Sequence, residues 1–281
     1  TSEGFQIFGL PPYKYYSAGY ACFMYGPNSN NWMQDNHDVW KNSMDLAGVQ
    51  NGGIICFKYF GFGGLAQDTK GVKAFAGIKK GDDAKLNLNL TSNGKGAFMI
   101  HVKLDDPWKG EEVGVIRVSD KFPKGKALTC SVPVPALEGL TGKHAIYLVV
   151  EGPEVQQPEQ PQRGQWGRRP QQPQRPEGLF DLHGLGFAKN GKGGIPAMVP
   201  EITIKVDGQQ LNIPEMPIMS TNANGYTECN HYQLYGPLKA SSKVEATSNV
   251  TKVKIEVGPV VEGRATVKAT YKGKEKIFLI N

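Results

Sequence analysis

Apolar and polar residues alternate along most of the chain, which is the pattern of strands that bury one face. In residues 84–90 (AKLNLNL), for example, Leu86, Leu88 and Leu90 fall on one face. Six further segments with alternating or densely apolar patterns are expected to be strands, namely 53–62, 98–104, 113–118, 128–134, 144–150 and 178–187. Their connections are too short for crossover helices, so the pattern predicts an antiparallel β-sandwich.

A second series of strands begins near residue 201. Residues 201–206 (EITIKV) alternate and end at Asp207-Gly208, a dipeptide typical of a tight hairpin. Segments 250–257, 264–271 and 276–280 continue the series. With 281 residues the chain can hold two cores. We therefore expect an all-β protein, with a larger sandwich over residues 1–188 and a smaller, immunoglobulin-like sandwich over 189–281.

Residues 152–177 interrupt the strand pattern. This segment consists mainly of proline, glutamine, arginine and glutamate, and it has few apolar side chains that could offset the entropy of ordering. A further strand pattern follows directly, so the segment is predicted to be a loop inserted ahead of the last strand of the first domain.

The charge pattern argues against nucleic acid as a partner, and the hydropathy argues against insertion into a membrane. The net charge is +6, but the lysines are scattered, as in Lys252 and Lys254, whereas a nucleic-acid surface gathers them on one face with stacking aromatics between them. No run of eighteen apolar residues occurs, so no membrane insertion is expected. The sequence opens with Thr1 and shows no signal-peptide pattern, so we expect it to be a mature or truncated piece of a longer protein.

The cysteines show neither metal-ligand spacing nor a redox motif. Cys22, Cys56, Cys130 and Cys229 include no CxxC pair. Cys56 and Cys130 lie in apolar strand patterns, which favours buried thiols, and a disulfide remains an open alternative in an oxidising compartment.

No catalytic constellation is evident from the sequence. It contains no GxSxG, Walker or HExxH motif. Acidic side chains surround a Pro-Trp-Lys-Gly turn, and a pair of them could in principle hydrolyse glycosides, although such turn residues are usually solvated; they are Asp105, Asp106, Glu111 and Glu112. We expect the chain not to be an enzyme.

Two features are compatible with sugar binding. Trp32 and Trp40 lie in polar, asparagine-containing stretches and Trp108 lies in a turn, where exposed rings could stack on a pyranose. The alternative is that each ring closes an end of the sandwich core. Asp181 and His183 share a face of one predicted strand, either as sugar or ligand contacts or as a polar pair at a strand end.

The order of these segments resembles the region that follows the catalytic propeller in family 43 glycoside hydrolases. The matching segments are Thr1–Gly4 with Leu10–Lys14, Gly52–Gly63, Ile100–Val118, Gly142–Val149 and Leu179–Phe187. Residues 1–188 are similar to a family 6 carbohydrate-binding module, and the resemblance implies a jelly-roll sandwich that binds glycans.

The resemblance also bears on site residues. The family places two acidic residues on its opening strand, at the positions of Ser17 and Gly19, which help bind a structural calcium or a sugar. The closing strand offers a sugar contact at the position of Asp181 and a metal ligand at that of His183, and calcium prefers oxygen ligands. We therefore expect no cofactor and no calcium, and a carbohydrate site at Trp32, Trp40, Asp181 and Trp108.

The expected function is that of a non-catalytic, carbohydrate-binding accessory region of an exported bacterial glycoside hydrolase, located in the periplasm, at the cell surface or outside the cell. Its partners would be a polysaccharide or oligosaccharide and an upstream catalytic domain. Two alternatives remain: a structural spacer with a degenerate sugar site, and a small glycoside hydrolase.

Overall fold

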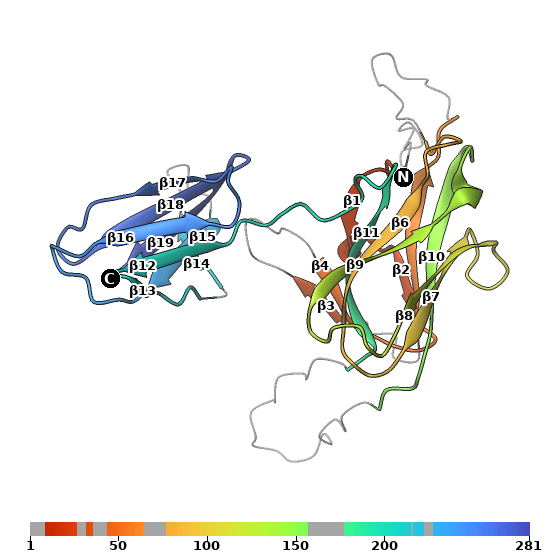
Figure 1. Ribbon diagram of the computed structural model, residues 1–281, viewed down its shortest axis with the longest axis horizontal. Helices are drawn as coiled ribbons and strands as arrows, with labels where there is room; N and C mark the ends of the chain where they lie inside the picture. The colour runs from red at the N-terminus through yellow and green to blue at the C-terminus, as the bar shows by residue number, and fades with distance from the viewer. Residues whose placement is uncertain are drawn as a thin grey trace. The chain divides into compact units, whose positions relative to one another are not determined.

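A computed structural model describes residues 9–26, 32–35, 44–64, 77–156, 177–214, 216–221 and 227–281. The chain forms two compact units (Figure 1). The first unit contains the described residues up to Pro196, and the described residues from Ala197 onwards belong to the second. The prediction had placed the domain boundary at residue 188.

The first unit is a sandwich of two sheets. Within the described residues, one sheet has six strands: β3 (Trp32–Asp35), β4 (Met44–Val49), β11 (Phe180–Ala188), β6 (Lys85–Ser92) and β9 (Ala127–Pro133) in that order, with β1 (Tyr15–Ser17) paired to β11. The other has five: β2 (Phe23–Tyr25), β5 (Ile54–Gly61), β10 (Lys143–Glu151), β7 (Phe98–Leu104) and β8 (Glu112–Val118). Short 3-10 helices span Ala18–Tyr20 and Pro135–Leu137.

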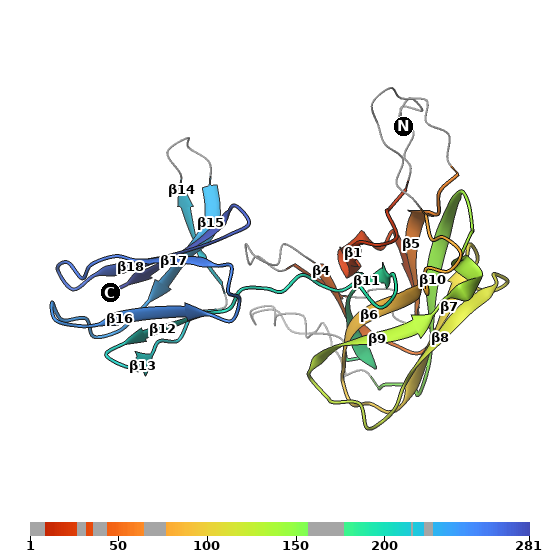
Figure 2. The same cartoon turned by 45° about the horizontal axis from the view of Figure 1, so that its top comes forward.

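The path of the chain makes this unit a jelly roll. Successive strands from β4 onwards pass repeatedly from one sheet to the other, and the strands pair antiparallel. Figure 2 shows β6, β9 and β11 in one layer and β5, β7, β8 and β10 in the other. The predicted all-β, jelly-roll fold of the first domain is confirmed.

The core lies between the two sheets and is built from the alternating residues. Leu86, Leu88 and Leu90 are fully buried, as their shared face predicted. Phe98 of the five-stranded sheet stacks on Phe180 of the six-stranded sheet, with ring centroids 4.9 Å apart. Contacts of this kind hold the sheets together through burial of apolar surface, which stabilises the fold by about 25 cal/mol per Å².

The second unit is also built of two sheets. Its described strands form a three-stranded sheet, β13 (Gln209–Gln210), β12 (Ile202–Val206) and β16 (Val244–Ser248), and a five-stranded sheet, β14 (Ile218–Thr221), β15 (Thr227–Leu234), β19 (Lys274–Ile280), β18 (Ala265–Tyr271) and β17 (Lys254–Val257). β15 and β19 run parallel. The immunoglobulin-like character of this unit stays a prediction.

The predicted hairpin turn of the second unit is present. Asp207 and Gly208 both have positive φ, at 50° and 83°, between the paired strands β12 and β13. Two successive positive φ values are typical of a type I′ turn, whose twist matches that of the flanking strands.

Two expectations concern other segments. Most of the proline- and glutamine-rich segment predicted over 152–177 lies outside the described residues. Within the described part of the chain, no helix is long and apolar enough to cross a membrane.

Candidate functional site

A row of three hydrogen-bonded polar side chains lies on the outer face of the six-stranded sheet, the face turned away from the core. His183 of β11 stands between Asp45 of β4 and Thr91 of β6, on three neighbouring strands. Its Nδ1 is 3.1 Å from Asp45 Oδ2, and its Nε2 is 2.7 Å from Thr91 Oγ1. We call these three residues the polar row.

The polar row is fixed in place yet open to solvent. The side chains of His183 and Asp45 are 24% and 27% exposed. The pairing between β11 and β6 shifts register between Leu182 and Gly184, so His183 sits at an irregularity of the strand. Bulges of this kind redirect side chains and are frequent at binding sites.

Tyr15 and Asn89 extend this polar face. Burial and the nearby Asp45 carboxylate raise the pKa of the Tyr15 hydroxyl, and a hydrogen bond with Asn89 partly opposes them. Asn89 pairs with Gly184 across β6 and β11. The hydroxyl therefore stays protonated over the physiological range and can act as a donor.

Asp181, predicted to contact sugar, is 5% exposed. Its Oδ1 accepts a hydrogen bond of 2.8 Å from the Gly48 backbone N–H and one of 3.4 Å from Asn93 Nδ2. These bonds tie β11 to β4 and to the turn after β6. The described geometry gives the carboxylate a role in the fold, and its predicted sugar contact stays a prediction.

The predicted tryptophans are not brought to one place by the described structure. The backbone of Trp32 lies in β3, where it pairs with Ala47 of β4, the strand that carries Asp45. Trp108 lies in the turn between β7 and β8 of the other sheet, and it is 68% exposed. Trp40 lies outside the described residues.

The acidic residues near Trp108 are occupied by hydrogen bonds within the fold. Asp105 accepts from the backbone N–H of Ala145 at 2.8 Å and lies 2.7 Å from Nδ1 of His144. Asp106 accepts from the backbone N–H groups of Trp108 and Lys109, which lowers the pKa of its carboxyl. A carboxylic acid that must protonate a leaving group needs a raised pKa instead, and Asp106 has the opposite shift.

Two positions that the resemblance links to calcium, Ser17 and Gly19, lie against β11 and β4. Ser17 pairs with Gly184 of β11, next to His183. A Cβ built on Gly19 would lie 2.6 Å from the Cβ of Met44, so no longer side chain fits there without rearrangement. Among the residues that the structure describes, no group of three or more histidine, cysteine, aspartate or glutamate side chains is placed to hold a metal ion.

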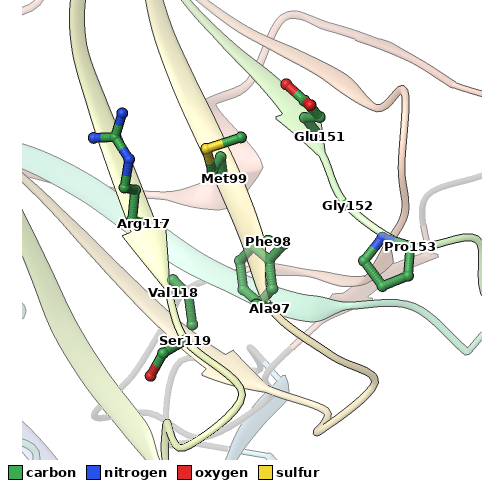
Figure 3. A pocket seen from close by; sticks show the side chains of 9 residues that line it. All are labelled: Ala97, Phe98, Met99, Arg117, Val118, Ser119, Glu151, Gly152 and Pro153. Atoms are coloured by element: carbon green, nitrogen blue, oxygen red, sulfur yellow. The ribbon is translucent and has the colours of Figure 1, made fainter.

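The outer face of the five-stranded sheet has a shallow hollow at one end. Its volume is about 530 Å³, and it is lined by Ala97, Phe98, Met99, Arg117, Val118, Ser119, Glu151, Gly152 and Pro153. Figure 3 shows Met99 between Arg117 and Glu151, whose charged groups point to the same side. Glu151 also accepts from Nε2 of His101, while Nδ1 of His101 contacts Glu112. This hollow was not predicted.

Sequence reasoning identified His183 but missed its two partners. Thr91 continues the outward face of Asn87 and Asn89 in the alternating strand, so its position was readable from the pattern. Asp45 lies in a segment (MDLAGV) that carries no clear alternation, and only the pairing of β4 with β11 brings it to His183.

No family model matches the chain, and no curated protein matches it. Solved structures that resemble it include a family 6 carbohydrate-binding module from Clostridium stercorarium in complex with cellobiose, which is 15% identical with a TM-score of 0.39 over 65% of this chain and 98% of that one. A β-1,3-glucan-binding family 6 module from Bacillus halodurans is 14% identical, with a TM-score of 0.39 over 63% of this chain and 97% of that one.

A family 43 arabinoxylan arabinofuranohydrolase from Bacillus subtilis, in complex with cellotetraose, is 17% identical with a TM-score of 0.40, over 65% of this chain. The match spans only 28% of that enzyme's length. These structures come from the two groups that residues 1–188 resemble by sequence.

Proposed function

We propose that the first unit binds carbohydrate without transforming it, and that the polar row is where it does so. The observation that carries this proposal is the fixed arrangement of Asp45, His183 and Thr91 on three adjoining strands, with the side chains of Asp45 and His183 about a quarter exposed. The three side chains lie on strands and are hydrogen-bonded to one another. They therefore lose little conformational entropy when a ligand binds.

The chemistry of the row suits sugar hydroxyls, which both donate and accept hydrogen bonds. The Asp45 carboxylate and the Thr91 hydroxyl oxygen can accept from sugar hydroxyls, whereas both nitrogens of His183 are engaged by these two residues and hold them in position. Tyr15 and Asn89 add further polar groups on the same face. Sites that orient polar ligands use a small number of such convergent groups.

Trp32 is the proposed stacking residue, since its backbone lies in β3 beside the strand that carries Asp45. In the same proposal Trp40 contributes a second ring, and the chain acts as the accessory region of an exported polysaccharide-degrading enzyme, next to an upstream catalytic domain. No cofactor takes part.

A second candidate function is that of a structural spacer without a sugar site. One observation favours it: Asp181, the position to which the resemblance assigns a sugar contact, is buried and bonded to Gly48 and Asn93. The two functions differ in whether the purified chain binds any glycan.

Isothermal titration and affinity electrophoresis against soluble β-linked glucans and xylans test the proposal. We expect at least one glycan to bind and His183→Ala to weaken its binding by about tenfold, roughly 1.4 kcal/mol, because Asp45 and Thr91 lose the ring that holds them in position. His101→Ala is a matched control, because this histidine is 21% exposed and also paired with carboxylates, but on the other sheet. If no glycan of the panel binds the wild-type chain, the proposal fails and the spacer remains.

A further inference from the structure

Cys22 and Cys56 are neighbours across two paired strands. Phe23 of β2 is the register partner of Cys56 in β5, and the backbone N–H of Cys22 donates to the carbonyl of Cys56 at 2.9 Å. Cys22 directly precedes the edge strand β2, and this bond ties it to the residue that faces the first position of that strand.

The side chains of the two cysteines also meet. The Cys22 thiol donates to the Cys56 carbonyl oxygen at 3.4 Å, and it is near enough to the Cys56 thiol to raise the pKa of that group. A backbone N–H···O bond of 2.9 Å between the two residues keeps their Cα atoms less than about 7 Å apart, and the Cα atoms of disulfide-bridged cysteines usually lie about 4.4–6.8 Å apart. From this juxtaposition we propose that Cys22 and Cys56 form a disulfide that fastens the edge strand β2 to the five-stranded sheet.

The Cys22 thiol is exposed to a dissolved oxidant and the Cys56 thiol is buried, so Cys22 reacts first when the disulfide forms. Cys22 is exposed, so its thiolate attacks the disulfide of an oxidant such as oxidised glutathione, forming a mixed disulfide and releasing one glutathione. Cys56 then attacks the Cys22 sulfur and releases the second glutathione. Both protein thiols lose a proton and together give two electrons, which reduce the oxidant to two thiols.

Cys56 is the slower partner in the folded chain. It is buried, and burial raises the pKa of its thiol to about 12, against the opposing effects of Tyr147 and Lys58, which face it. The thiolate is the reacting species, so we expect the bond to form most readily during folding, before the sheet closes over Cys56.

Cys130 and Cys229 are not part of the proposed disulfide and serve as internal controls for it. Cys130 is half-buried in β9 of the other sheet, and Cys229 is exposed in β15 of the second unit. In the proposal both stay reduced, and the Cys22–Cys56 bond closes a loop that includes β3 and β4. Closing a loop of this length stabilises a fold chiefly by restricting the unfolded chain.

The test is to refold the chain in a mixture of reduced and oxidised glutathione, alkylate the free thiols and map the digest by mass spectrometry without reduction. We expect a peptide that links Cys22 to Cys56, with alkylated Cys130 and Cys229. The oxidised first unit should melt roughly 6–15 °C above the reduced one. Alkylation of both Cys22 and Cys56, or a link between another pair, would overturn the proposal.

Variants separate the bond from general damage to the fold. Cys22→Ser should fold, because the side chain is exposed, and it should lose both the linked peptide and the difference between the oxidised and reduced melting temperatures. The matched control Cys229→Ser, also exposed, should keep both. A redox-dependent melting temperature that persists in Cys22→Ser would likewise contradict the proposed pair.

Discussion

Gly48 and Asp181 are 133 positions apart in the sequence, yet the Gly48 backbone N–H donates a 2.8 Å hydrogen bond to Asp181 Oδ1. Both groups are buried, so the bond is shielded from water. Asp181→Ala leaves the N–H of Gly48 without this acceptor, and we expect a loss of about 2–3 kcal/mol in the free energy of unfolding.

Asp181→Asn keeps a side-chain oxygen that can accept, so its cost should be smaller, about 1 kcal/mol. Urea titration followed by tryptophan fluorescence measures both. Equal stability of Asp181→Ala and the wild type would show that the carboxylate is free for a ligand rather than used by the fold.

The glycines of β11 show how closely another backbone approaches this strand. A Cβ on Gly184 would lie 2.1 Å from the Tyr16 carbonyl oxygen and 2.6 Å from the Tyr15 hydroxyl. Gly184→Ala should therefore displace β1 and destabilise the first unit by about 1–3 kcal/mol, the usual cost of overpacking. Gly114→Ala, in β8, is the control: its new Cβ meets side-chain atoms of Val132 at 3.1 Å, and the effect should be smaller.

The alternation of single residues made much of this fold predictable. The alternating Leu86, Leu88 and Leu90 predicted both a strand and its buried face, and Asp207-Gly208 predicted a hairpin. Gly184 and Gly186, spaced two apart in an apolar strand, could also have been read as a sign of close backbone approach. β2 and β3 are three and four residues long, too short to show a period, and they were not predicted.

The candidate site was harder to predict, because it depends on pairing between distant strands. His183 was recognisable as an outward polar residue, but its partners Asp45 and Thr91 come from β4 and β6. Neither spacing nor composition specifies which strands become neighbours. The role of Asp181 was hidden for the same reason, since Gly48 reaches it only through the pairing of β4 with β11.

Asp82 should make the stability of the first unit depend on acid pH. It is held by Lys189, by the Tyr13 hydroxyl and by the Lys79 backbone N–H, which together lower its pKa from 3.8 to about 2. A group whose pKa is lower in the folded state stabilises the fold above its unfolded pKa, and that contribution is lost as the pH falls.

We therefore expect Asp82→Asn to melt below the wild type at pH 7, with the difference shrinking as the pH falls from about 4 to about 2. Calorimetry over this range measures it. Asp83→Asn serves as the control, because Asp83 is largely exposed and its ammonium partner Lys85 is 3.7 Å away. A difference for Asp82→Asn that stays constant down to pH 2 would show that its charge is not the cause.

A substitution of Trp108 tests which of two surfaces binds sugar, the polar row or the β7–β8 turn. Its backbone is fixed, since its N–H donates to Asp106 and its carbonyl accepts from Lys103, whereas the side chain is mostly exposed. Trp108→Ala should therefore change the free energy of unfolding by less than about 0.5 kcal/mol. Because it lies between strands of the other sheet, we also expect glycan affinity to stay within about twofold of the wild type, measured by titration beside His183→Ala. Loss of binding in Trp108→Ala with full binding in His183→Ala would move the site from the polar row to the β7–β8 turn.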